Sequence, residues 1–172
     1  RAAPHMIESL EALCYAYSKN GEPEAVINVA ANALKLDPDQ INLSLMQAGA
    51  YFGMGHMEHA FDIIDAALEF NPEHIDALQN RGVIQERLLD IDGAKETYRK
   101  LLHLDPSRSA TKFNLALCEL LQGNFHEGFA LYESRFHKGL NLVKFYLGDE
   151  PVWDGSQSLE GKHLLVHPEQ GY

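Results

Sequence analysis

Three prolines recur at an interval of 34 residues, and each of them follows an aspartate or an asparagine. The pairs are Asp37-Pro38, Asn71-Pro72 and Asp105-Pro106. Proline disfavours a helical conformation in the residue before it, so each pair is expected to end one helix before the next begins. A fixed period of this length indicates a stack of like units, each of which buries its apolar face only against its neighbours. Stacks of this kind contribute extended binding surfaces more often than catalytic chemistry.

Small side chains recur at two places when the chain is aligned on these prolines in windows that begin at Ile7. The eighth position, where a large side chain would push two helices apart, carries Cys14, Ala48, Gly82 and Ala116. The twentieth position carries Val26, Ala60, Ala94 and Gly128. Each window is therefore expected to hold two closely packed helices. The space between units would be filled by position 24, which carries Ala30, Ile64, Tyr98 and Tyr132.

Apolar spacing and turn residues agree with paired helices. One helical stripe is formed by Ile27, Ala30, Ala31 and Leu34. A glycine past a helix end relieves left-handed strain, and three windows have one, at Gly21, Gly55 and Gly123. The third window has Leu89-Asp90 instead. We predict helices over residues 8–19, 24–36, 41–54, 57–70, 75–88, 92–104, 109–122 and 125–137.

The period and its small residues resemble the tetratricopeptide repeat, a helix-turn-helix unit of 34 residues. The resemblance is clearest from Gly55 through Ala60 to Asn71-Pro72. It implies an all-α fold, a right-handed superhelix of four repeats at 7–40, 41–74, 75–108 and 109–138. The fourth repeat departs from the pattern, because Arg135 stands where a small residue is expected and no proline closes the unit. Terminal repeats often depart in this way, because one face caps the stack.

Composition and charge argue against several classes of partner. A hydrophobic content of 45% supports a sizeable core, and no apolar run approaches the roughly 20 residues of a membrane-spanning helix, so no membrane partner is expected. The formal net charge of −11 opposes nucleic-acid binding, which needs a surplus of Lys and Arg. It favours basic or neutral peptides through electrostatic steering. The same charge also serves solubility alone, and the sequence leaves both interpretations open.

The two cysteines, Cys14 and Cys118, fall in first helices three units apart, at sites expected to face the core. A disulfide needs Cα atoms within about 7 Å, which a superhelix would not allow here. Two buried thiols indicate a reducing interior, so we expect the protein to be cytoplasmic. Residues 1–6 read like a remnant of an expression vector, so the natural N-terminus, and a signal with it, would be missing.

Residues 139–172 carry a specific combination of motifs: Trp153-x-Gly155, Leu159-x-Gly161-Lys162, an apolar run, and Glu169-Gln170-Gly171. This combination resembles the junction in bacterial proteins that join tetratricopeptide repeats to a glycosyltransferase-like domain, related to the O-linked N-acetylglucosamine transferases or the heptosyltransferases. The resemblance implies that the apolar run is the first strand of a Rossmann-like half. One strand cannot form such a half, which needs several strand-helix units of about 30 residues each. We interpret 139–172 as a linker and a truncated strand. We expect this chain to be catalytically inert and to bind no cofactor.

The tail also suggests self-association. An unpaired strand edge invites pairing with another copy, and the apolar run Leu164-Leu165-Val166 would lack its sheet. We expect the tail to pack on its own last repeat or to swap into a second molecule.

If the geometry of the repeat family holds, window positions 2, 5, 6, 9, 12 and 13 line an inner groove. Asn80 and Asn114 share position 6, and an amide can donate to and accept from a peptide backbone at once. The O-linked N-acetylglucosamine transferases are similar in carrying an asparagine ladder. Here Ala12 and Met46 fill the equivalent places, and two merely solvated amides are the alternative. The other predicted groove residues are Phe52, Gln79, Arg87 and Phe113, with the aromatic rings either anchoring a ligand side chain or packing in the fold.

Two more specialised sites are disfavoured. A clamp for chaperone carboxyl termini needs Lys and Arg at positions that hold Glu11, Tyr15, Met46, Asp76 or Ala110 here. Zinc ligands can share a helix face three residues apart, as His56 and His59 do, but without further ligands nearby a solvated turn is favoured and no metal is expected.

Two functional hypotheses follow. The chain is either a protein-interaction scaffold that holds a peptide or partner protein in its groove, or the substrate-presenting arm of a larger bacterial glycosyltransferase whose catalytic domain is absent from these residues.

Overall fold

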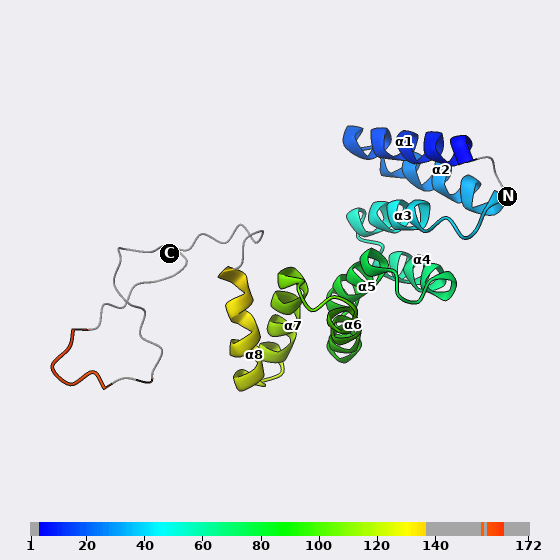
Figure 1. Cartoon of the computed structure of the whole chain (residues 1–172). Helices are drawn as coiled ribbons and strands as arrows, with labels where there is room; N and C mark the ends of the chain where they lie inside the picture. The colour runs from blue at the N-terminus through cyan, green and yellow to red at the C-terminus, as the bar shows by residue number, and fades with distance from the viewer. Residues whose placement is uncertain (1–3, 137–155, 157, 164–172) are drawn as a thin grey trace.

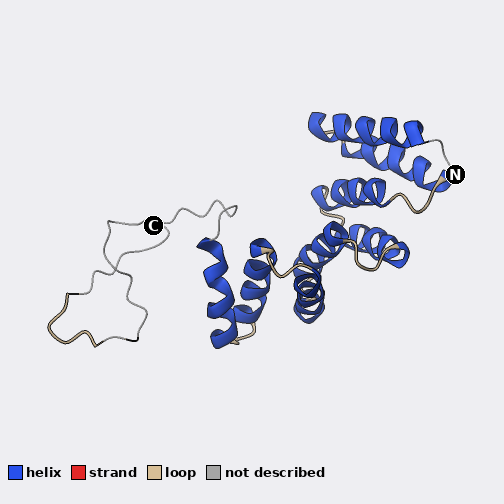
Figure 2. Cartoon of the chain, in the orientation of Figure 1, coloured by secondary structure: helices blue, strands red, loops and turns tan. Residues whose placement is uncertain are grey.

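A computed structural model describes residues 4–136, 156 and 158–163 of the chain. Within these residues the structure is all-helical, with eight α-helices and a final 3-10 helix (Figure 1, Figure 2). The predicted fold class is confirmed. The elements are α1 (Pro4–Asn20), α2 (Pro23–Leu36), α3 (Ile41–Gly53), α4 (Met57–Phe70), α5 (Ile75–Arg87), α6 (Ile91–Leu104), α7 (Ser109–Leu121), α8 (Phe125–Tyr132) and η1 (Glu133–Phe136).

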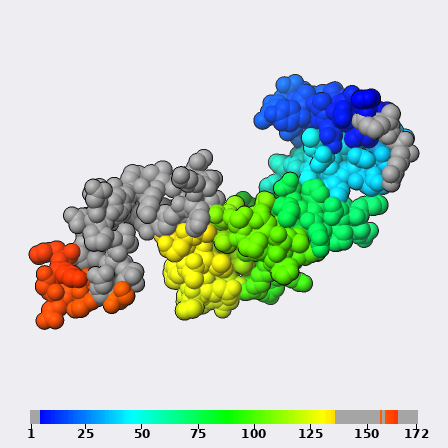
Figure 3. All heavy atoms as spheres, viewed as in Figure 1, coloured from blue at the N-terminus to red at the C-terminus, as the bar shows by residue number. Residues whose placement is uncertain are grey.

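The helices pack in pairs, and each pair touches only its neighbours in the chain. Within the pairs α1 packs on α2, α3 on α4, α5 on α6 and α7 on α8, and between pairs α2, α4 and α6 each pack on the helix that follows. The described helices therefore form a bent, elongated body rather than a globule (Figure 3).

The two helices of a pair meet at the positions predicted to hold small residues. In the first helices, Cys14, Ala48 and Ala116 are at most 2% exposed. In the second helices, Val26, Ala60 and Ala94 are also at most 2% exposed. In the third repeat the ring of Tyr98 is fully buried against Gly82, where an added Cβ would overlap the ring. A small residue on one helix thus makes room for a large one on the other, which keeps the interior close-packed.

The turn between the two helices of a repeat is the same in all four repeats. After α3, the Gly55 amide donates to the Phe52 carbonyl and the His56 amide to the Tyr51 carbonyl, at 3.0 and 2.9 Å. Such a turn needs a left-handed residue, and Gly55 has φ 83°. The third repeat keeps the same pair of hydrogen bonds without a glycine, because Leu89 itself adopts φ 62°. The departure seen in the sequence is therefore a strained residue in an unchanged turn.

The proline pairs separate the repeats as predicted. Asp37, Asn71 and Asp105 follow α2, α4 and α6 with φ of −148°, −141° and −140°. These extended residues end the second helix of each repeat.

The fourth repeat corrects the helix predicted over 125–137. α8 stops at Tyr132, and the last turn is the 3-10 helix η1. Arg135 is only 7% exposed, and its guanidinium carbon lies 4.3 Å from the centre of the Tyr132 ring. Its Nη1 also donates to the Tyr132 carbonyl oxygen at 3.1 Å. The equivalent position of the other repeats carries Ala33, Ala67 or Leu101, all buried in the core, whereas the Arg135 side chain lies over Tyr132 at the end of α8.

The chain ends differ in how much the structure describes. α1 begins at Pro4, earlier than predicted, so part of the segment interpreted as a vector remnant is helical. Residues 137–155, 157 and 164–172 lie outside the described residues, and with them the predicted strand and the packing of the tail. Of the tail, residues 158–163 form a turn in which the Lys162 amide donates to the Leu159 carbonyl at 3.0 Å.

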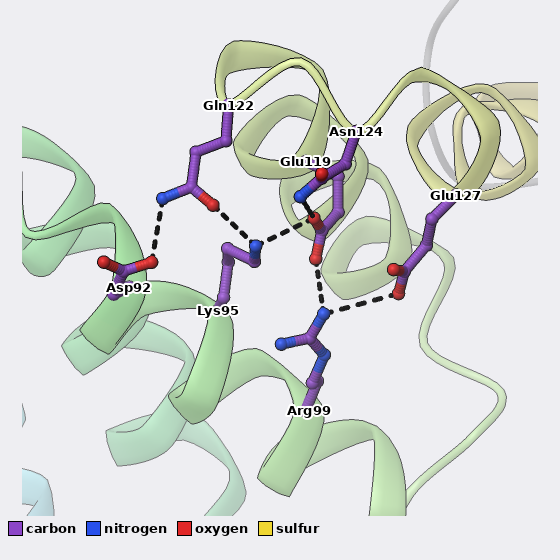
Figure 4. A network of polar contacts seen from close by, with 7 residues as sticks. All are labelled: Asp92, Lys95, Arg99, Glu119, Gln122, Asn124 and Glu127. Atoms are coloured by element: carbon purple, nitrogen blue, oxygen red, sulfur yellow. Dashed lines mark hydrogen bonds and ion pairs between the residues drawn. The ribbon is translucent and has the colours of Figure 1, made fainter.

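A buried carboxylate ties the third repeat to the fourth (Figure 4). Glu119 of α7 is fully buried, and its two oxygens lie 2.8 Å from Lys95 Nζ and 2.5 Å from Arg99 Nη2 of α6. Asn124 donates a further hydrogen bond at 2.7 Å. Burial by itself raises the pKa of Glu119, but the hydrogen bonds from Lys95 and Asn124 and the two positive charges outweigh it and hold the pKa below its usual range. The network extends to Gln122, Asp92 and Glu127.

A second polar contact joins the second repeat to the third. Arg81 of α5 donates through Nε to Asp65 of α4 and through Nη1 to Thr97 of α6, both at 2.9 Å. The side chain therefore fixes three helices relative to one another.

We predict that Leu89→Gly stabilises the protein. A left-handed residue other than glycine costs roughly 1–2 kcal/mol, part of which glycine loses again through its greater freedom in the unfolded chain. Leu89 is 80% exposed, so little buried surface is lost. The net gain in free energy of unfolding is expected to be about 0.5–1 kcal/mol, measured by urea denaturation. An unchanged or lower midpoint would contradict a strained turn.

We predict that Glu119→Gln destabilises the protein at neutral pH by about 3 kcal/mol, because a buried cation loses its counter-charge. A carboxylate with a lowered pKa stabilises the fold above its unfolded pKa, and this contribution disappears as the pH falls through the folded pKa. The difference between wild type and variant should therefore shrink as the pH is lowered toward 3, followed by urea denaturation at each pH.

The matched control is Glu127→Gln. Glu127 is half exposed and 3.4 Å from the same Arg99, so its loss should cost less than about 1 kcal/mol. Equal effects of the two substitutions would show that burial of Glu119 is not what matters.

Candidate functional site

The first helices of the four repeats, α1, α3, α5 and α7, present the residues that the sequence assigns to a groove. α1 contacts α3 and α3 contacts α5. Side-chain hydrogen bonds from Thr111 to Gln79 and from Cys118 to Glu86 join α7 to α5. The surface of these four helices is here called the first-helix face (Figure 1). The second helices lie behind it and supply most of the contacts between repeats.

A cleft of about 110 Å³ opens on the first-helix face between α3 and α5. It brings together two of the predicted site residues, Phe52 from α3 and Asn80 from α5. The remaining walls are apolar or bare backbone, from Ala48, Gly49, Val83 and Ile84. The cleft is therefore a neutral hollow with one polar group in its wall.

Asn80 has hydrogen-bonding capacity that the fold does not use. Its side chain is half-buried, yet it forms no hydrogen bond with any residue that the structure describes. A side-chain amide offers two donors and a carbonyl acceptor. These groups are available to a ligand in the cleft.

Asn114 and Gln79 are engaged within the fold instead. Asn114 of α7 donates to the buried Tyr98 hydroxyl at 3.3 Å, and Gln79 of α5 accepts from the Thr111 hydroxyl at 2.6 Å. Both amides therefore help to join repeats. The two asparagines at position 6 are not equivalent, and Asn80 alone of the pair faces the cleft with an unused amide.

Phe113 and Arg87 lie apart from the cleft lining. The Phe113 ring is half-buried, with its centre 5.4 Å from that of Tyr132 in α8, so it packs between the helices of the fourth repeat. Arg87 ends α5, is exposed, and forms no ion pair with the described residues. Phe113 thus contributes to the core as well as to the face, and Arg87 contributes charge at its edge.

The cysteine thiols and the tyrosine hydroxyl buried beneath the face are unreactive at neutral pH. Burial, followed by the nearby Glu86 carboxylate, raises the pKa of Cys118 to about 12, and the same two causes raise the pKa of Tyr98 well above its usual value. Cys14 is also buried, and burial followed by the charge of Glu11 raises its pKa. Because the thiolate is the reactive form, neither thiol is a nucleophile at neutral pH.

The histidine pair packs rather than gathers ligands. His59 stacks on the ring of Tyr51 with centroids 5.3 Å apart, and His56 meets both rings edge-on. Among the described residues, no three His, Cys, Asp or Glu side chains come together as a metal ion would need.

Gly49 and Val83 line the cleft, although neither is among the site residues predicted from the sequence. Both occupy window position 9, one of the inner positions, so the repeat register contained the signal. A second signal is Gly49 itself, because glycine inside a helix costs about 1 kcal/mol relative to alanine and usually has a packing or functional reason.

The chain is similar to proteins built from tetratricopeptide repeats. The tetratricopeptide-repeat family model matches residues 75–108. The FK506-binding protein-like of Rattus norvegicus is 30% identical over 115 residues, which are 62% of this chain and 33% of that protein. The chain spans about a third or less of the length of the curated relatives that it matches first.

Two solved structures share the fold. The crystal structure of MamA has a TM-score of 0.70 at 21% identity, covering 74% of this chain and 75% of that one. The first TPR of Spaghetti (RPAP3), bound to the HSP90 peptide SRMEEVD, has a TM-score of 0.64 at 23% identity, covering 67% and 94%. The described helices thus have the fold of a tetratricopeptide-repeat array. None of them combines the length and the apolar character needed to cross a membrane.

We predict that the two asparagines differ in their effect on stability. Asn114→Ala deprives the buried Tyr98 hydroxyl of a partner and should lower the free energy of unfolding by about 1 kcal/mol. Asn80→Ala removes no hydrogen bond and should change it by less than about 0.5 kcal/mol. Urea denaturation of both variants checks this. A cost for Asn80→Ala equal to that of Asn114→Ala would make Asn80 a structural residue.

Proposed function

We propose that this chain is a protein-interaction module that holds an extended segment of a partner protein on its first-helix face. The observation that carries the proposal is Asn80, whose amide has no partner in the described structure although it lies in the wall of a cleft. An amide that both donates and accepts matches the alternating groups of an extended peptide backbone. The neutral cleft beside it supplies contact for a side chain of the same segment.

The charge of the chain indicates which partners fit. The net charge is −11, and the first-helix face carries exposed acids such as Glu8 and Asp76. The Spaghetti (RPAP3) repeats bind a peptide with three acidic residues, SRMEEVD. In this chain the positions of a carboxylate clamp hold no Lys or Arg, so a neutral or basic segment fits this face better than an acidic one.

A larger parent protein is a separate proposal. The motifs within residues 153–171 resemble the junction to a glycosyltransferase-like domain, and in such a parent the repeats would act as the arm that presents a substrate. Continuation of the reading frame into strand-helix units would support this proposal, whereas a stop codon soon after Tyr172 would refute it. Self-association through Leu164-Leu165-Val166 and a cytoplasmic location stay predictions.

The proposed function predicts a defined binding surface. Peptides selected from a random display library on the full chain should be neutral or basic, and their NMR shift changes should map to α3, α5 and α7. Asn80→Ala should weaken their binding about tenfold, which corresponds to the net worth of one or two backbone hydrogen bonds. Isothermal calorimetry measures the affinities.

Two controls make the test specific. Glu127→Gln, on the second-helix side, should leave peptide affinity unchanged. Binding that maps to α2, α4 and α6, or that ignores Asn80→Ala, would refute the proposed surface.

A further inference from the structure

Gly49 is a glycine that the fold itself does not require. It lies inside α3, and a Cβ added to it would meet no atom within 4 Å. The two buried glycines of the array behave differently, because a Cβ at Gly82 would overlap Tyr98 and one at Gly128 would overlap Leu120. Gly53, one turn after Gly49, likewise has open space around it. The bare surface of α3 therefore serves no packing contact within the described structure.

Gly49 also lines the cleft between α3 and α5. The volume of the cleft, about 110 Å³, is smaller than the roughly 150 Å³ of an engineered cavity that takes up benzene, so it suits a branched aliphatic side chain better than a large ring. None of its lining residues is charged. A lysine or aspartate side chain would lose water there without gaining a counter-charge.

Gly49 and Asn80 lie in the wall of the same cleft and offer complementary contacts. A position without a Cβ lets a ligand backbone approach the helix closely. The Asn80 amide, unused by the fold, can then pair with that backbone. The ring of Phe52 and the Val83 side chain flank the space that remains for a side chain.

We propose that this cleft is the anchor pocket of the interaction module and that it takes a leucine, isoleucine or valine side chain of the partner segment. The partner backbone lies against the glycine surface of α3 and is hydrogen-bonded by Asn80. The inference rests on the proposed function and adds to it the residue class that the face selects. A buried aliphatic anchor of this kind dominates the affinity of many interfaces.

The test uses capped single amino acids as probes for the full chain. N-acetyl-leucine methylamide, titrated at millimolar concentration, should shift the NMR resonances of Gly49, Gly53, the Val83 methyl groups and the Asn80 side-chain amide. Its dissociation constant should be at least about fivefold lower than those of the lysine, aspartate and tryptophan derivatives. Equal affinity for the four probes, or shifts elsewhere on the surface, overturns the proposal. A cleft occupied by a second copy, seen as Gly49 and Val83 shifts on dilution, also overturns it. So does a cleft occupied by the chain's own tail, seen as no response to the probe at any protein concentration.

Substitutions at Gly49 provide the matched variants. Gly49→Leu adds a side chain to the wall of the cleft. It should weaken the binding of N-acetyl-leucine methylamide at least about tenfold, while circular dichroism confirms the helical fold. Gly49→Ala should raise the urea midpoint, and it should weaken the binding of the probe less than Gly49→Leu does. Ala66→Leu, on the exposed side of α4, should leave probe binding unchanged.

The library-selected peptides separate this proposal from the one on which it rests. If they bind the first-helix face but bind wild type and Gly49→Leu equally well, the anchor pocket is wrong and the interaction module stands. If no peptide binds the face at all, both are wrong.

Discussion

Burial between neighbours is the interaction on which the rest of this structure depends. No helix pair covers its own apolar face, so each repeat is ordered only by the repeat beside it. The small residues at the eighth and twentieth window positions make that burial possible, because they bring the helix backbones together. The same arrangement sets all four first helices side by side on one surface. A chain built in this way has a binding face as a direct consequence of how it hides its core.

Polar side chains then adjust what burial alone leaves free. Glu119 with its two cations, and Arg81 with Asp65 and Thr97, fix how one repeat sits against the next. Residues of the first-helix face also take part in such contacts, because the side-chain amides of Gln79 and Asn114 form hydrogen bonds to neighbouring repeats. Asn80 differs from them only in having no such neighbour. The candidate site is therefore what remains of the face after the array has been assembled.

The sequence predicted the helices well, because proline and small-residue positions are fixed by local backbone geometry. It failed where a side chain replaced the expected type. The last α-helix stops at Tyr132 in the repeat that carries Arg135, and Leu89 adopts the turn conformation for which glycine was expected. The groove prediction stays a prediction, and it could not tell Asn80 from Asn114, since the difference lies in the Tyr98 hydroxyl of another helix, to which Asn114 donates. The sequence also did not predict that Gly49 borders an open cleft, because the cleft depends on how α3 and α5 pack against each other.

The buried ion pair network at the junction of the third and fourth repeats has a consequence for how the array responds to its surroundings. The core around α1, α2 and the start of α3 is a cluster of aliphatic and aromatic side chains with one thiol. Such contacts weaken in the cold and are insensitive to moderate salt. Charged contacts that reach the surface, as Arg99 does at 50% exposed, respond to ionic strength instead. Cooling therefore acts on the apolar cores along the whole array, whereas electrolyte acts mainly where the third repeat meets the fourth.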